Sequence, residues 1–147
     1  MTTVAEDMIR ILEDADIGDH HYRRWSEYFT PADQKAFEDR PLSMIASEAR
    51  SSQDVDVTVA ADRSTVNLVF AGQYNEQGQS RVYDFALEVY RFFRNGGEAP
   101  ACLLDVEVNG HDYLCIKAQH PPSHDGIDQD GRTIYSFELD IYRALEA

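Results

Sequence analysis

Three histidines and one cysteine in the C-terminal half of the chain have the types and spacing to bind a metal ion. His111, Cys115, His120 and His124 follow one another with three or four residues between successive members. Imidazole and thiolate groups are the usual zinc ligands, but structural zinc sites hold ligands in closely spaced pairs, typically separated by two residues. No such pair occurs here, so we predict no metal site and interpret the histidines as ordinary surface residues.

An acidic segment near the C-terminus resembles a calcium loop in composition. Asp125, Asp128 and Asp130 stand just before a glycine. An EF-hand loop needs oxygen ligands at its first, third and fifth positions and a glutamate at its twelfth. Aligned on that pattern, Gly126 takes the first position and Phe137 the twelfth. The sequence therefore predicts a plain acidic turn.

Other catalytic motifs are missing from the sequence. It has neither a glycine-rich phosphate loop nor a nucleophile elbow. Pairs of carboxylates occur, but a chain with 27 acidic residues contains such pairs by chance. Cys102 and Cys115 are too few for a disulfide framework and lie in apolar, strand-like segments, so we interpret them as buried free thiols. We predict that the protein is not an enzyme and binds no cofactor.

The charge balance limits the partners of the protein. The 27 acidic and 13 basic residues give a formal net charge of −14, and only Lys35 and Lys117 are lysines. Such a surface is typical of proteins from high-salt cytoplasms, because molar salt screens the self-repulsion. An acidic protein from an arginine-biased genome explains it equally well. Either origin disfavours broad nucleic-acid binding, which requires an excess of cations.

Two segments have the apolar periodicity of amphipathic helices. One is residues 3–16, where Thr3 and Glu6 match a capping box. The other is residues 80–94, where a wide apolar surface predicts a deeply packed helix. Residues 19–52 are irregular, and there we predict a small helical insertion.

Within that insertion we expect short helices near residues 30–37 and 42–49. It also contains the most basic segment of the chain, residues 22–25, whose arginine and tryptophan side chains could contact nucleic acid. We favour a helix that packs Trp25 onto a sheet and turns the arginines toward acids of a neighbouring subunit.

Apolar residues that alternate with polar ones predict strands in the rest of the chain. These are residues 55–59, 66–70, 104–108, 112–116 and 135–141. Residues 61–64 are expected to form a turn, Asn109 and Gly110 strongly predict a hairpin turn, and residues 120–132 are expected to form a long loop.

These elements predict one domain over residues 1–147, of the α+β class. Two main helices would pack on one antiparallel-rich mixed sheet, with the small helical insertion at 19–52. No apolar run approaches the length of about 20 residues that a membrane span requires, and the N-terminus is acidic where a signal peptide is basic. We therefore expect an intracellular protein without membrane contact.

The chain also resembles a known protein family over residues 3–17 and about 54–145. The shared pattern is an apolar strand, a polar turn and a helix, then an Asn-Gly hairpin, a proline-containing stretch and an Asp-x-x-Gly-Arg turn before an alternating strand. Its parts are residues 66–72, 83–95, 109–110, 119–121, 128–132 and 135–141. This pattern is similar to that of the tail-terminator and minor-capsid (tail-completion) proteins of long-tailed viruses, which also open with a short helix.

The resemblance implies a structural virion protein that forms a homohexameric ring. Such a ring ends the tail tube and joins it to the head-completion or connector protein, while viral DNA passes through the lumen without specific binding. It would be assembled in the host cytoplasm and remain in the tail or neck of the virion, and the acidity would suit a halophilic host. We expect its interface in the segment 120–132, at His120, Pro121, Asp125, Asp128, Asp130 and Arg132.

Three alternatives remain open from the sequence. The first is a head-completion or connector protein of the same neck. The second is a cytosolic module of a halophile that binds a small ligand between helix and sheet. The third is an enzyme whose site has no recognisable motif. Size in solution separates a ring from the last two.

Overall fold

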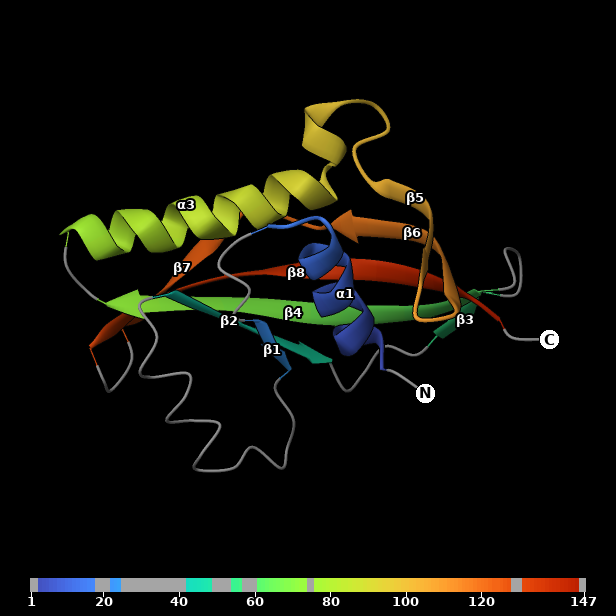
Figure 1. Ribbon diagram of the computed structural model, residues 1–147, viewed down its shortest axis with the longest axis horizontal. Helices are drawn as coiled ribbons and strands as arrows, with labels where there is room; N and C mark the ends of the chain where they lie inside the picture. Colours follow the sequence, from blue (N-terminus) through green and yellow to red (C-terminus); the bar gives the residue numbers. More distant parts are fainter. Residues whose placement is uncertain are drawn as a thin grey trace.

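A computed structural model gives the fold of the protein (Figure 1). It describes residues 3–17, 22–24, 42–48, 54–56, 61–73, 76–127 and 131–145. The elements in chain order are α1 (Val4–Asp14), β1 (Tyr22–Arg24), β2 (Leu42–Glu48), β3 (Asp54–Asp56), β4 (Ala61–Gln73), α3 (Glu76–Phe93), the short 3-10 helix η1 (Asn95–Gly97), β5 (Leu103–Val108), β6 (His111–Ala118), β7 (Ser123–Ile127) and β8 (Arg132–Ala144).

The strands form one sheet around a central pair, β4 and β8. These two 13-residue strands are antiparallel along their whole length, from Ala61 opposite Ala144 to Gln73 opposite Arg132. The order across the sheet is β1-β2-β4-β8-β6-β5, while β3 pairs with β4 and β7 with β8. The pair β1–β2 is parallel, and the other described pairs are antiparallel.

The predicted fold class, α+β with two main helices on one sheet, is wrong. Strand residues outnumber helical residues by about two to one in the described part of the chain. The protein is therefore a sheet-rich fold, and it is not built of two main helices on a sheet. The missing strands are β1, β2 and β7, which lie where the sequence indicated helices or a loop.

Two strands lie inside the segment that was expected to be helical. β2 pairs with β4 along its seven residues, and β1 pairs with β2, so residues 22–24 are not part of a helix. An apolar run as short as β2 fits the helical and the extended period equally well. Pairing settles the choice, because it buries Met44 and Ala46 on one face of the sheet and Ile45 on the other. The short helix expected at 30–37 and Trp25 lie outside the described residues.

The long loop expected over 120–132 contains a strand. β7 pairs with β8, and its register includes Ser123 opposite Ser136 and Ile127 opposite Thr133. β6 lies along the same edge of β8, farther toward the C-terminus of β8. The two prolines between β6 and β7 lack the N–H that a ladder requires, so they divide one long edge into two strands.

The predicted turn at 61–64 is also wrong, because β4 begins at Ala61.

Local sequence signals at the first helix and at the Asn-Gly turn are confirmed. The Thr3 hydroxyl accepts a hydrogen bond from the Glu6 N–H at 3.3 Å, and the Glu6 carboxylate accepts one from the Thr3 N–H at 3.2 Å. Asn109 and Gly110 have φ values of 52° and 78°, as a two-residue hairpin turn between β5 and β6 requires. No helix in the described part of the chain is long and apolar enough to cross a membrane.

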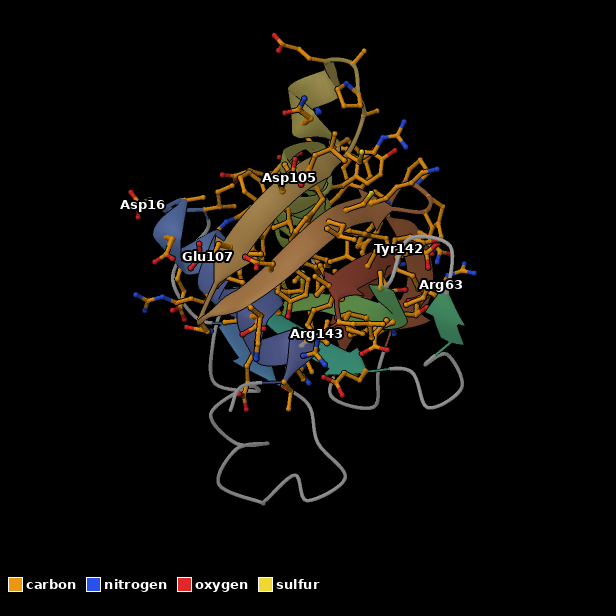
Figure 2. The ribbon with its side chains drawn as sticks, turned by 90° about the vertical axis from the view of Figure 1, so that its right-hand side faces the viewer. Asp16, Arg63, Asp105, Glu107, Tyr142 and Arg143 are labelled. Carbon is orange, nitrogen blue, oxygen red and sulfur yellow. The ribbon has the colours of Figure 1, made fainter. Side chains whose placement is uncertain are left out.

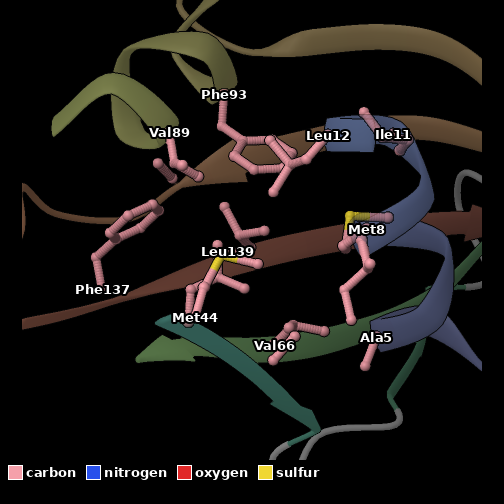
Figure 3. Close-up of a cluster of buried hydrophobic side chains, with 14 of the residues drawn as sticks. Ala5, Met8, Ile11, Leu12, Met44, Val66, Val89, Phe93, Phe137 and Leu139 are labelled. Carbon is pink, nitrogen blue, oxygen red and sulfur yellow. The ribbon is translucent and has the colours of Figure 1, made fainter. Parts of the chain in front are cut away.

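The hydrophobic core lies between the sheet and the two helices, which cover the same face (Figures 1 and 3). Met8 and Leu12 of α1 and Phe93 of α3 are fully buried with Leu139 of β8. β8 contributes most regularly, because every second residue from Thr133 to Ile141 is buried. This alternation holds the sheet in one register, since a slip by one residue would turn the apolar set toward the other face.

Candidate functional site

The structure describes four of the six residues that the sequence analysis placed at an interface. They lie on β7, at the start of β8 and in the link between β6 and β7, and they are His120, Pro121, Asp125 and Arg132. The other two, Asp128 and Asp130, lie between β7 and β8, outside the described residues. The four described residues thus belong to the paired strands β7 and β8 and to the link that precedes β7.

The predicted polar residues make contacts within this hairpin. The Asp125 carboxylate accepts a hydrogen bond from the hydroxyl of Ser136, on the neighbouring strand. The Ser123 hydroxyl donates to the Ser136 carbonyl oxygen at 3.3 Å, and Nδ1 of His120 donates to the Pro121 carbonyl oxygen at 2.8 Å. Both Asp125 and His120 therefore stabilise their own hairpin, whatever they contact outside it.

A group of aromatic and apolar side chains lies beside these residues, and we call it the aromatic patch: Tyr83, His124, Ile127 and Tyr135. His124 is opposite Tyr135 and Ile127 is opposite Thr133, so both β7 residues share the helix-covered face of the sheet. The ring centroids of His124 and Tyr135 are 4.9 Å apart, and those of Tyr83 and Tyr135 are 5.5 Å apart. The patch thus joins α3 to the hairpin.

Two members of the aromatic patch are unusually open to solvent for apolar residues. The exposed fraction is 39% for Tyr83 and 50% for Ile127. Tyr135 is buried, with its ring against those of Tyr83 and His124, and Nε2 of His124 lies 3.0 Å from the Thr133 hydroxyl, which orients the imidazole. Rigidly held aromatic side chains with exposed surface are the type that carries binding energy in protein interfaces.

The aromatic patch was not predicted from the sequence. Tyr83 lies within residues 80–94, the helix predicted to be deeply packed, and His124 was interpreted as an ordinary surface residue. No interface role was predicted for Ile127 or Tyr135. The signal that would have found them is the register of β7 on β8, which requires recognising residues 123–127 as a strand.

A buried polar group was also not predicted from the sequence. We call it the Asp7 cluster: Asp7, Asn109, His111 and Tyr113. The Asp7 carboxylate on α1 is fully buried, and it accepts hydrogen bonds from Asn109 Nδ2 at 2.8 Å, His111 Nδ1 at 2.7 Å and the Tyr113 hydroxyl. Three donors from the β5–β6 hairpin thus meet one carboxylate of the first helix, which ties the helix to the far end of the hairpin.

Electrostatics within the Asp7 cluster favours a neutral tyrosine. Burial raises the pKa of Tyr113 well above its ordinary value, and the hydrogen bond to Asp7 and the negative charge of Asp7 raise it further. The nearby Arg143 on β8 opposes this shift. The Tyr113 hydroxyl therefore stays protonated and donates to the carboxylate at physiological pH.

The Asp7 cluster contains an Asp–His pair, which hydrolases use to orient a histidine base. However, the side chains that would act are sealed from solvent, because His111 is 6% exposed and Tyr113 is 1% exposed. A substrate cannot reach them without displacing α1. We interpret the cluster as a structural polar contact.

The histidines considered as metal ligands lie in three separate environments. His111 contacts Asp7, His120 contacts the Pro121 carbonyl oxygen, and His124 packs on Tyr135. Within the described ranges, no three His, Cys, Asp or Glu side chains gather as a metal site would require. The structure therefore gives no geometry on which a metal centre could be built from them.

No protein-family model and no curated protein matches the chain. The resemblance to tail terminators rests on the sequence motifs alone.

Proposed function

We propose that the protein is a structural subunit of a long-tailed virus, which forms a ring that ends the tail tube and joins it to the head connector. In this proposal the aromatic patch is the surface that meets the neighbouring ring or subunit. The observation that carries it is the exposure of Tyr83 and Ile127 beside the hairpin where the resemblance places the contact.

The rigidity of this surface supports an assembly role. Tyr83 lies on an 18-residue helix, while His124 and Ile127 lie on a strand paired with β8. Side chains on such elements lose little conformational freedom when a partner binds, so more of the contact energy remains as affinity. A tail-tube subunit or a head-completion subunit with an apolar rim would be a suitable partner.

The composition fits a ring through which DNA must pass. A formal charge of −14 repels phosphate, so an acidic lumen would let DNA slide without binding it. The ring would assemble in the host cytoplasm as a homohexamer and remain in the virion. The same charge would suit a virus of a halophilic host, because high salt screens the repulsion between subunits.

The structure changes which residues we assign to the contact. Asp125 and His120 are already engaged within the hairpin, whereas Tyr83 and Ile127 present apolar surface. We therefore propose that Ile127 and Tyr83 supply the binding energy. Pro121 and Arg132 would lie at the rim of the same contact.

The test is the capping of tail tubes by the purified protein. Tubes assembled from the virus's own tube protein should be capped at one end in electron micrographs, and the complex should sediment with the tubes. Ile127→Asp places a charge in the proposed contact, so it should reduce tube binding at least tenfold. The matched control is Leu104→Asp, because Leu104 is 52% exposed on β5, in the other part of the sheet, and should bind as the wild type does.

The outcomes test the proposed contact site and the proposed function independently. If the wild type binds tubes and Ile127→Asp binds equally well, the aromatic patch is not the contact. If the wild type fails to bind tubes in low and in molar salt, the tail-terminator proposal is wrong. Binding to head connectors alone would identify a head-completion subunit instead.

A further inference from the structure

The two cysteines are brought together by the β5–β6 hairpin, although 12 residues separate them in the sequence. Leu103 pairs with Ile116 and Leu104 with Cys115. Continued by one residue, this register sets Cys102 opposite Lys117 and diagonal to Cys115, on the same face of the sheet. Figure 2 looks onto this hairpin, with Asp105 and Glu107 labelled on β5.

The thiols of this pair influence each other electrostatically. Burial raises the pKa of Cys115 to about 11, and the hydrogen bond to Cys102 raises it as well, while Lys117 lowers it and Asp140 raises it slightly. Both cysteines are half-buried, not fully buried as the sequence analysis expected, so a small oxidant can reach the sulfurs.

We propose that Cys102 and Cys115 are a redox pair that closes to an intramolecular disulfide when the protein leaves reducing surroundings. The oxidant is a small-molecule disulfide such as oxidised glutathione. Cytosolic thiols are kept reduced, whereas disulfides persist outside the cell. We therefore expect free thiols inside the cell and the disulfide outside it.

The reaction proceeds by two thiol–disulfide exchanges. The Cys102 thiolate attacks one sulfur of oxidised glutathione, which forms a mixed disulfide and expels one glutathione thiolate. Cys115 then gives up its proton and attacks the Cys102 sulfur, which forms the intramolecular disulfide and expels the second glutathione thiolate. The protein loses two protons and two electrons, and one oxidised glutathione becomes two reduced glutathiones.

The order of attack follows from the protonation of Cys115. The thiolate is the nucleophile, and the high pKa of Cys115 makes it a poor first attacker at neutral pH. Cys102 is therefore the attacking residue and Cys115 the resolving residue. For the same reason the closing of the internal disulfide is slow, so brief oxidation inside a cell leaves that bond unformed.

The disulfide would link the segment after η1 covalently to β6 of the sheet. Glu98, Ala99 and Pro100, which precede Cys102, are exposed, and Cys102 itself lies just outside β5. Closing the loop between the two cysteines removes conformational freedom from the unfolded chain and so stabilises the fold. The idea that the disulfide forms after virus release rests on the proposed function. The chemistry of the two thiols does not depend on that function.

The test uses the full-length protein, first reduced and then treated with oxidised glutathione. Intact-mass spectrometry should show a product lighter by two hydrogens, and peptide mapping should show Cys102 joined to Cys115. The midpoint of thermal unfolding should rise by roughly 5–10 °C upon oxidation and return when reductant is added.

Single variants supply the controls. Cys115→Ser lacks the resolving thiol, so it should stop at a glutathione adduct on Cys102, and its melting midpoint should not rise. Cys102→Ser should react more slowly than Cys115→Ser. The proposal is overturned if the wild type collects stable glutathione adducts, or if it forms disulfide-linked dimers in place of the internal bond. Because the readout is on the free subunit, it is independent of whether the protein caps tail tubes.

Discussion

The Asp7 cluster and the aromatic patch lie on the same side of the sheet, yet they use their polar and aromatic groups in opposite ways. In the cluster, one fully buried carboxylate meets three donors, and little of the tyrosine or the histidine reaches solvent. In the patch, Tyr83 and Ile127 remain 39% and 50% exposed, while Tyr135 is buried. A buried polar group that is fully paired stabilises one arrangement of the fold, whereas an exposed apolar group contributes energy only when a partner covers it.

The Asp7 cluster should be where a single substitution affects folding most. Asp7→Ala leaves the donors of Asn109, His111 and Tyr113 without their common acceptor, so it should lower the free energy of unfolding by about 3 kcal/mol in urea titrations. Asp14→Ala, on the same helix, should change it by less than about 0.5 kcal/mol. Equal effects of the two variants would show that the hydrogen bonds of Asp7 do not stabilise the fold.

Salt should separate the buried cluster from the charged surface. The formal charge of −14 repels itself at low ionic strength, so the melting midpoint should rise by roughly 5 °C between 0.05 and about 1 M NaCl. The difference in melting midpoint between the wild type and Asp7→Ala should remain the same across this range, because salt screens buried interactions little. A midpoint that stays level or falls in high salt would contradict the halophilic interpretation.

Alkaline pH should probe Tyr113 specifically. Its folded-state pKa is raised above the unfolded value of about 10, so its contribution to stability is complete below pH 10 and decreases as pH rises above it. Between pH 9 and pH 11 the wild type should lose about 1.4 kcal/mol more unfolding free energy than Tyr113→Phe does. Parallel losses in both proteins would mean that the hydroxyl is not held protonated by Asp7 and burial.

The aromatic patch should show the smallest effect on folding. Ile127→Asp removes an exposed apolar side chain and leaves the core intact, so the free energy of unfolding should change by less than about 1 kcal/mol. Chemical denaturation alongside Leu104→Asp measures this, and the two variants should agree. A loss comparable to that of Asp7→Ala would place Ile127 in the core and remove the contrast between the two regions.

Some features of the fold could be predicted because their causes are local. The Thr3–Glu6 capping box, the Asn109–Gly110 turn and the alternating final strand each depend on residues a few positions apart. The turn even determines the register that sets Cys102 beside Cys115, so the redox pair could have been found from the sequence.

Other features depend on pairing between distant segments, and only the tertiary structure decided them. The short run Leu42–Glu48 becomes a strand because β4 supplies its hydrogen-bond partners, and polar Ser123–Ile127 becomes one because β8 does. Asp7 meets three donors that lie more than 100 residues away in the sequence. Local periodicity cannot contain this information, because a backbone group or a buried carboxylate is satisfied by whichever partner the folded chain brings within hydrogen-bonding distance.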